Sequence, residues 1–283
     1  EQLEQLEVFK QKKQGVFLIT GPKKSGITTT MYSLIRNHDA FLNNINTLEK
    51  QPTGQLLNVT QAVFSLTDTG TTTYAKKLQS ISRMGADIIG VGECEDAETA
   101  KIASIAARDG KIVYVVMESS SVLHALGKWL KMVEDRRLVA ETLVGISNQR
   151  LLRKLCETCK QGYAPNKELL KKFNMPADKA KVLFRPGKEI FDKRGKPSTC
   201  PDCQGTGFIG RTGVFEMIVL DDDLRKAVKT VKQLPELGVQ FRKAKMLYMQ
   251  EQALRKVIAG TTAINEMLRV LAPAKKEGAP AAQ

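Results

Sequence analysis

Short apolar runs alternate with longer amphipathic stretches over roughly the first half of the chain. Four runs rich in β-branched residues have the length of buried strands, namely residues 16–19, 45–48, 88–91 and 112–117. Stretches between them have the apolar spacing of helices, as in residues 31–35. This alternation predicts an α/β fold of βαβ units, with a mostly parallel sheet covered by helices. Ligands in such folds bind at the carboxyl ends of the strands.

The pattern changes along the chain and predicts five segments. We expect 1–14 to be a charged lead-in helix at the cut edge of a longer protein, 15–150 the α/β core, 151–215 an irregular metal-binding insertion, 216–271 a helical region, and 272–283 a low-complexity, disordered tail.

A glycine loop follows the first predicted strand and precedes a predicted helix, which is the context of a phosphate-binding P-loop. Its residues are Gly21, Pro22, Lys23, Lys24, Ser25, Gly26, Ile27, Thr28 and Thr29. Glycines let the backbone N–H groups face an anion, and the helix adds its positive N-terminal dipole. Thr28 stands where the motif hydroxyl meets magnesium, with Thr29 beside it, but Ile27 occupies the lysine position.

That isoleucine leaves three interpretations of the loop. Either the pocket binds nucleotide without hydrolysing it well, or Lys23 or Lys24 reaches back over the phosphates on its flexible stem. In the third, the segment is an ordinary turn before a helix.

An acidic residue ends the third predicted strand. Residues 85–93 are an apolar run that delivers Glu93 at its carboxyl end. P-loop proteins present a carboxylate in this way to magnesium or to the attacking water, although a buried strand that ends in a surface glutamate has the same pattern.

Four of the five cysteines form two Cys-x2-Cys pairs, Cys156 with Cys159 and Cys200 with Cys203. This spacing predicts a closed structural zinc site with four thiolate ligands. Disulfides and redox motifs are the alternatives, but disulfides are rare inside cells and redox motifs do not come as matched pairs. Cys94 is expected to be a small buried residue.

The chain has a net charge of +14, which suggests a nucleic acid or an anionic membrane as a binding partner. Residues 151–200 carry much of this charge, with 13 Lys/Arg against 5 Asp/Glu. A basic face is therefore expected there. Only 6% of residues are aromatic and they are not interleaved with the basic run, so nucleic-acid binding is not expected. No apolar run has membrane-spanning length and no signal-peptide pattern is present, which favours a soluble intracellular protein.

Several segments in this order resemble the C-terminal motor domain of the ATPases of type II secretion and type IV pilus assembly. The similarity covers roughly residues 10–271. Besides the glycine loop and Asp87–Glu93, it is carried by Asp96 with Glu98-Thr99-Ala100, Gln149-Arg150-Leu151, Leu155-Cys156-x2-Cys159-Lys160, Cys200-x2-Cys203-x-Gly205-Thr206-Gly207-Phe208-x-Gly210-Arg211-Thr212-Gly213, and Gly260-Thr261-Thr262.

The resemblance implies a RecA-like core that works in a hexameric ring on the cytoplasmic side of the inner membrane, with a membrane platform protein as partner. It implies ATP and magnesium at the glycine loop, with phosphate binding by Gly21, Ser25, Gly26, Thr28 and Thr29. It also implies a water-activating or magnesium-linked role for Glu93, a matching role for Glu49, and zinc on the four paired cysteines.

The departures from the family pattern concentrate at the chemistry. Ile27 replaces the lysine, the acidic box reads Glu49-Lys50-Gln51-Pro52 in place of Glu-Asp-Pro, and Glu118 stands where a histidine is expected. The two histidines, His38 and His124, are expected on helix surfaces. Arg83 matches a family arginine, but the arginine-bearing domain that precedes the motor in the family is not part of this sequence.

The favoured hypothesis is therefore a secretion or pilus motor domain that binds nucleotide weakly and hydrolyses it poorly. Such a chain would serve as a subunit or scaffold beside copies of itself or an active paralogue. The alternatives are an active ATPase that uses Lys23 or Lys24, and a basic zinc-bearing module that docks on acidic partner surfaces or anionic lipid without nucleotide.

Overall fold

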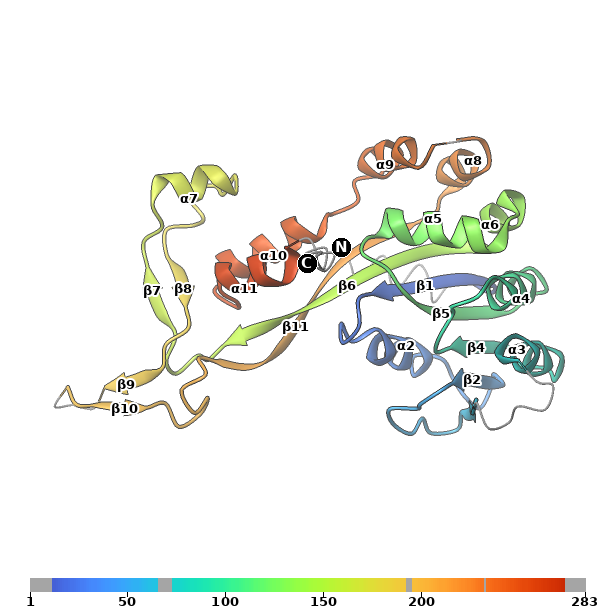
Figure 1. The fold of residues 1–283 in the computed structure, drawn as a ribbon, viewed down its shortest axis with the longest axis horizontal. Helices are drawn as coiled ribbons and strands as arrows, with labels where there is room; N and C mark the ends of the chain where they lie inside the picture. The colour runs from blue at the N-terminus through green and yellow to red at the C-terminus, as the bar shows by residue number, and fades with distance from the viewer. Residues whose placement is uncertain (1–11, 66–72, 192–194, 232, 273–283) are drawn as a thin grey trace, which may run out of the picture. The chain divides into compact units, whose positions relative to one another are not determined.

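The computed structural model describes residues 12–65, 73–191, 195–231 and 233–272 (Figure 1). The expected lead-in helix and disordered tail lie almost wholly outside these residues. Within the described residues, none of the helices combines the length and the apolar character needed to cross a membrane.

The elements are, in chain order, β1 (Gly15–Gly21), α2 (Ile27–Ile35), β2 (Ile45–Glu49), β3 (Thr60–Val63), α3 (Tyr74–Arg83), β4 (Ile88–Val91), α4 (Ala97–Arg108), β5 (Ile112–Glu118), α5 (Val122–Val133), α6 (Arg136–Thr142), β6 (Leu143–Leu155), β7 (Gln161–Tyr163), α7 (Lys167–Lys172), β8 (Leu183–Arg185), β9 (Glu189–Phe191), β10 (Pro197–Thr199), β11 (Phe208–Val219), α8 (Asp222–Thr230), α9 (Leu234–Lys243), α10 (Met249–Ile258) and α11 (Ile264–Leu271).

Seven strands form one sheet in the order β11-β6-β1-β5-β4-β2-β3. The pairs from β6 through β3 run parallel. At the edge, the Leu220 N–H donates to the Val144 carbonyl and the Cys156 N–H to the Gly207 carbonyl, so β11 runs antiparallel to β6. The predicted α/β class and mostly parallel sheet are confirmed, and each of the four predicted strands is present.

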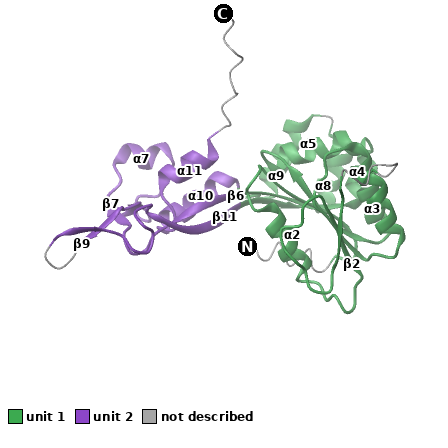
Figure 2. Cartoon of the chain, turned by 60° about the horizontal axis from the view of Figure 1, so that its bottom comes forward, with its two compact units in different colours: residues 1–149, 215–247 green, residues 150–214, 248–283 purple. Residues whose placement is uncertain are grey.

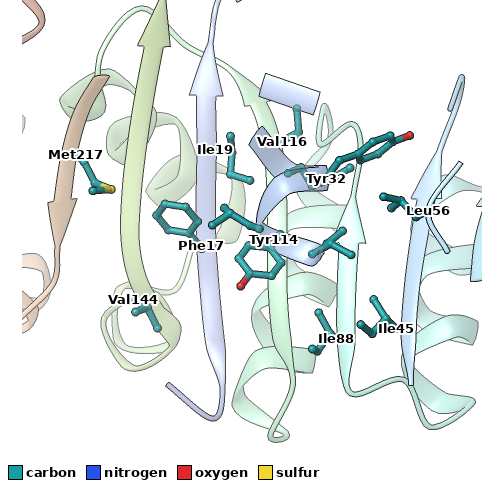
Figure 3. Packing of buried hydrophobic residues seen from close by; sticks show 13 residues of the cluster. Phe17, Ile19, Tyr32, Ile45, Leu56, Ile88, Tyr114, Val116, Val144 and Met217 are labelled. Carbon is teal, nitrogen blue, oxygen red and sulfur yellow. The ribbon is translucent and has the colours of Figure 1, made fainter. Parts of the chain in front are cut away.

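The central strand β1 is buried along its whole length because helices cover both faces of the sheet. Phe17 and Ile19 pack in one cluster with Tyr32 of α2 (Figure 3). The cluster also includes Met31 and Ile35 of the same helix. Residues that alternate with Phe17 and Ile19, such as Leu18, point to the opposite face. Both α4 and α5 also contact β1.

The chain forms two compact units (Figure 2), unit 1 of residues 1–149 and 215–247, and unit 2 of residues 150–214 and 248–283. The single helical region expected at 216–271 is divided between them, since α8 and α9 belong to unit 1 whereas α10 and α11 belong to unit 2. Both β6 and β11 contain residues of both units. Unit 2 has a hydrophobic cluster of its own, which includes Leu152, Leu183 and Val257.

Candidate functional site

The carboxyl ends of the parallel strands bring the candidate residues to one edge of unit 1. β1 ends at Gly21, which pairs in register with Glu118 at the end of β5. β2 ends at Glu49, and Glu93 lies two residues after β4. Strands that run parallel end at the same edge, which is where ligands bind in such sheets.

The glycine loop is curled by two residues in the left-handed region, Lys24 with φ 63° and Gly26 with φ 86°. Gly26 is the N-cap of α2 and provides no side chain to cap the helix. Within the loop the Ser25 N–H donates to the Pro22 carbonyl over 3.2 Å. The start of α2 therefore keeps backbone N–H groups that no side-chain cap satisfies, and these together with the helix dipole favour an anion.

Ser25 adds a buried hydroxyl to this helix terminus. The residue is 3% exposed, and its Oγ has no hydrogen-bond partner among the residues that the structure describes. Gly21 lies directly against it, because an added Cβ would stand 2.3 Å from Ser25 Oγ and 2.7 Å from the Gln149 carbonyl oxygen. An unpaired buried hydroxyl costs about 1–3 kcal/mol, so a ligand that paired with it would relieve that cost.

The first turn of α2 holds the residues at the lysine and magnesium positions of the motif. Ile27 is partly buried and packs against the hydrophobic cluster of the α2 face of the sheet. Thr28 is half-buried and Thr29 is exposed. The side chain at the lysine position thus contributes to the core and supplies no charge.

The charges nearest the loop come from its two lysines and from the end of β5. Lys23 and Lys24 are both exposed, and Lys23 Nζ lies 3.9 Å from Glu118 Oε1. The side chains of Lys23 and Glu118 are 85% and 53% exposed. An exposed pair of this kind is screened by solvent and holds neither group firmly. An exposed negative charge, Glu118, and an exposed positive charge, Lys23, therefore stand together beside the loop.

Glu49 is enclosed by hydrogen bonds and is 1% exposed. Its Oε2 accepts from the Tyr32 hydroxyl over 2.6 Å, and its Oε1 accepts from Thr47 Oγ1 over 2.8 Å and Gln61 Nε2 over 3.5 Å. Both oxygens are thus engaged by protein groups, as a buried carboxylate requires. Nothing in the sequence around Tyr32 signals this contact, which joins a helix to a neighbouring strand.

Glu93 keeps a more accessible position than Glu49. Its Oε2 accepts from the Lys50 N–H over 3.0 Å and from the Tyr74 hydroxyl over 3.4 Å. Burial raises the pKa of the Glu93 carboxyl and the charge of Glu49 raises it further, against the lowering effect of Lys50. A half-buried carboxylate with a raised pKa at a strand end has the properties of an acid–base group.

The two histidines differ from one another. His124 is exposed on α5, as expected, and its Nδ1 lies 3.0 Å from Ser119 Oγ, which places it beside the residue that follows Glu118. His38 was expected on a helix surface, but it lies beyond the end of α2, half-buried, with Nε2 2.7 Å from the Tyr114 hydroxyl. Burial lowers the pKa of His38.

The other two singled-out side chains have simple surroundings. Burial raises the pKa of the Cys94 thiol to about 12, so this cysteine is the unreactive buried residue that was expected. Arg83 is exposed at the end of α3.

The four paired cysteines of unit 2 come together and are all buried. Their Sγ atoms lie within 4.8 Å of one another, with 3.8 Å between Cys156 and Cys200 and 3.5 Å between Cys159 and Cys203. Four sulfurs around a tetrahedral zinc, each about 2.3 Å from the metal, stand about 3.8 Å apart, so the donor set fits zinc. With four protein ligands the centre has no open position and would stabilise the fold.

The chain matches a known family over almost its whole length. The model described as "Type II/IV secretion system protein" matches residues 1–269. A type II secretion system protein E of Dickeya dadantii is 32% identical over 267 residues, covering 94% of this chain and 50% of that protein. The type IV pilus assembly ATPase PilB of Thermus thermophilus is 31% identical over 257 residues, covering 91% of this chain and 28% of that protein. The chain thus spans half or less of these two relatives.

Solved structures share the fold at lower identity. A crystal structure of the pilus retraction motor PilT with bound ADP has a TM-score of 0.65 at 20% identity, covering 97% of this chain and 66% of that one. The ATPase DotB of Legionella pneumophila has a TM-score of 0.63 at 16% identity, covering 94% of this chain and 61% of that one. At this identity the likeness supports the fold alone.

Proposed function

Because the chain belongs to the type II/IV secretion system protein family, we propose that it is a motor-domain subunit that binds a nucleoside phosphate with magnesium but hydrolyses it poorly. The observation that carries the binding half is the buried Ser25 hydroxyl, which has no partner among the described residues and lies at the start of α2, where no side chain caps the helix. Both parts of this anion site come from the backbone and a neutral hydroxyl. Neither depends on the missing lysine.

The hydrolysis half rests on the charges around that backbone. A lysine at position 27 would stabilise charge that develops on the phosphates, and removal of such a group costs on the order of 3 kcal/mol, or about two powers of ten in rate. Ile27 packs against the core, and Glu118 adds a negative charge near the loop. A phosphate in the loop therefore meets less positive charge than a P-loop lysine and a histidine would supply.

The two candidate carboxylates would have unequal roles. Glu93 is half-buried at a strand end and is the better group to orient a water molecule or a hydrated magnesium ion. Glu49 already has both oxygens in hydrogen bonds to protein side chains, so we assign it the structural task of joining β2 to α2. With one available carboxylate and no lysine at position 27, slow turnover is the expected chemistry.

The assembly would follow the family. We infer a ring of this chain with itself or with an active paralogue, a hexamer by resemblance, docked on an inner-membrane platform protein from the cytoplasmic side. The cysteine cluster would hold a structural zinc ion. These statements rest on family membership, on relatives named for type II secretion and pilus assembly, and on the donor set of the cysteines.

The test is a titration with a fluorescent ADP analogue, with and without magnesium, followed by ATP turnover on the same preparation. We expect saturable micromolar binding that magnesium strengthens, with turnover at least one hundredfold below that of an active motor of the family. Thr28→Val is the matched variant, since it removes the hydroxyl at the magnesium position and leaves the backbone site. It should lose most of the magnesium effect. Turnover at the rate of an active motor would overturn the proposal, as would wild type without nucleotide binding.

A second candidate function is favoured by the position of Lys23. Its ammonium lies 3.9 Å from Glu118 Oε1, at the edge of the loop, and both side chains are exposed enough to move. In this alternative Lys23, or the neighbouring Lys24, turns toward the phosphates and the chain is an active ATPase. Lys23→Ala combined with Lys24→Ala separates this active ATPase from the poorly hydrolysing subunit, since only the active ATPase would lose turnover.

A further inference from the structure

Gln149 is a buried polar residue next to the glycine loop. It is 2% exposed and follows Asn148, which pairs in register with Thr20 of β1. It belongs to the segment Gln149-Arg150-Leu151, whose sequence alone indicates no role for the glutamine. Its side chain belongs to β6, whereas the loop belongs to the connection between β1 and α2.

One amide group spans the turn from the loop into α2. Gln149 Nε2 donates to the Ser25 carbonyl over 2.9 Å, and Gln149 Oε1 accepts from Thr30 Oγ1 over 2.8 Å. The Gln149 carbonyl oxygen also packs closely against Gly21, where an added Cβ would lie 2.7 Å away. The start of the loop, its last turn and the first turn of the helix therefore all contact this residue.

We propose that Gln149 is a positioning residue that holds the glycine loop in its anion-binding shape before the nucleotide phosphate arrives. The inference rests on the proposed function for the identity of the ligand. Position 27 has no lysine to hold the loop against the phosphates, so contacts within the protein must keep the loop ordered. A loop held in its bound shape loses less conformational freedom on binding, which strengthens the affinity.

To bond both the Ser25 carbonyl and the Thr30 hydroxyl, the side chain at position 149 needs a hydrogen-bond donor and an acceptor on one short, planar group. A glutamine amide has both, whereas a methionine of similar length and volume has neither. A glutamate has both only when it is protonated, because a carboxylate would place an oxygen against the Ser25 carbonyl. Burial raises the pKa of such a carboxyl, so its protonation falls within an accessible pH range.

The experiment compares wild type with Gln149→Met, Gln149→Glu and the control Ile146→Val. The control removes one methylene from a fully buried residue of the same strand, outside the loop. For each protein, affinity for a fluorescent ADP analogue with magnesium is measured from pH 5.5 to 8, beside the melting temperature. Hydrogen exchange of residues 22–30 without nucleotide is the second readout.

We expect Gln149→Met to bind about tenfold more weakly than wild type and to exchange faster in residues 22–30, since lost hydrogen bonds of this kind are worth about one power of ten. Ile146→Val should match wild type in both readouts. The affinity of Gln149→Glu, taken as a ratio to wild type at each pH, should rise about tenfold as pH falls. This recovery is measured within one folded protein, so it holds even where Gln149→Met is unstable.

The inference is overturned when Gln149→Met binds within twofold of wild type with unchanged loop exchange, or when the Gln149→Glu ratio is flat with pH. Wild type that binds no nucleotide overturns the proposed function instead. In that case the hydrogen exchange of residues 22–30 still decides whether Gln149 orders the loop.

Discussion

The glycine loop of unit 1 and the cysteine cluster of unit 2 are built from different parts of the chain. The loop is a helix start without a side-chain cap, and Ile27 stands where the motif has its lysine. The cluster is made only of side chains, and all four thiols lie within 4.8 Å of one another. A backbone site keeps its N–H donors when the side chain at position 27 changes, but a four-ligand metal site loses a donor with each ligand that is replaced. Loss of the lysine therefore changes the charge of the loop more than its geometry.

The largest expected effect is on the side-chain site. Cys200→Ser should abolish stoichiometric zinc and speed hydrogen exchange across residues 150–214, with destabilisation of several kcal/mol, because the free energy of binding structural zinc is also folding free energy. Cys94→Ala is the matched control, since Cys94 is buried outside the cluster. It should retain one zinc per chain by elemental analysis. A Cys200→Ser protein with one zinc per chain and unchanged hydrogen exchange would contradict the claim that the metal site depends on all four thiols.

Unit 2 also contains an ion pair network between β6 and α11, formed around one buried carboxylate. The Glu266 carboxylate is buried and accepts hydrogen bonds from Arg269 Nε over 2.8 Å and from Arg153 over 2.7 Å. Burial alone raises its pKa, but the bonds from Arg269 and Arg153 outweigh burial and hold the pKa at about 2. The carboxylate therefore stabilises the fold above its unfolded pKa of 4.5, and this stabilisation is lost as pH falls toward 2.

Glu266→Gln should cost about 2 kcal/mol of unfolding free energy at pH 7, and the difference from wild type should shrink below pH 4.5. Urea melts at pH 7, 4 and 3 measure it. Glu134→Gln, at an exposed carboxylate paired with Lys101, should change the melts little at any pH. A constant gap between wild type and Glu266→Gln across this pH range would contradict the assignment.

At the glycine loop we expect a moderate gain in nucleotide affinity. Ile27→Lys should strengthen binding of the ADP analogue about tenfold, since it returns the cation to a loop whose shape is already formed. Turnover should stay low, because Glu118 still occupies the position of the expected histidine and Glu49 remains enclosed by hydrogen bonds. Ile27→Met, which preserves the apolar volume without charge, should bind as wild type does. An Ile27→Lys protein that is folded and binds no better would show that the loop lacks a phosphate-binding shape.

The smallest effect is expected at the exposed lysines. Lys23→Ala combined with Lys24→Ala should change nucleotide affinity and turnover less than twofold at 0.15 M salt, because exposed charges on mobile side chains are screened. The ADP titration and ATP turnover assay measure this. A tenfold loss of turnover, together with loss on Glu93→Gln, would instead favour the active ATPase that uses these lysines.

The strands and the cysteine cluster could be predicted because their signals are local. Apolar runs such as residues 16–19 and 112–117 lie within β1 and β5, and Cys-x2-Cys spacing brings two thiols to one turn wherever it occurs. The surroundings of Glu49 could not be predicted in this way. Its partners Tyr32 and Gln61 come from a helix and a separate strand, so the contact exists only once the sheet and α2 have packed.

The division of the chain into two units could not be predicted from the order of residues along the sequence, because each unit combines two separate segments. The helical spacing within residues 216–271 predicts a helical region, but it says nothing about which surface a helix in it covers. Only the contacts of the folded chain assign α8 and α9 to unit 1, and α10 and α11 to unit 2. The hydrogen bonds from the Gln149 amide to Ser25 and Thr30 could not be predicted for the same reason. Gln149 on β6 is more than a hundred residues from the loop in sequence, and only folding brings them together.

The sequence by itself determined the family, the α/β class, the four thiols and the absence of a lysine at position 27, because these are properties of residue type and spacing. The tertiary structure decided what that absence means. It shows that Ile27 packs against the core, that Glu49 is enclosed, and that Ser25 Oγ is left without a partner among the described residues. Burial and hydrogen bonding depend on which distant segments meet, and those meetings are set by the packing of the whole sheet.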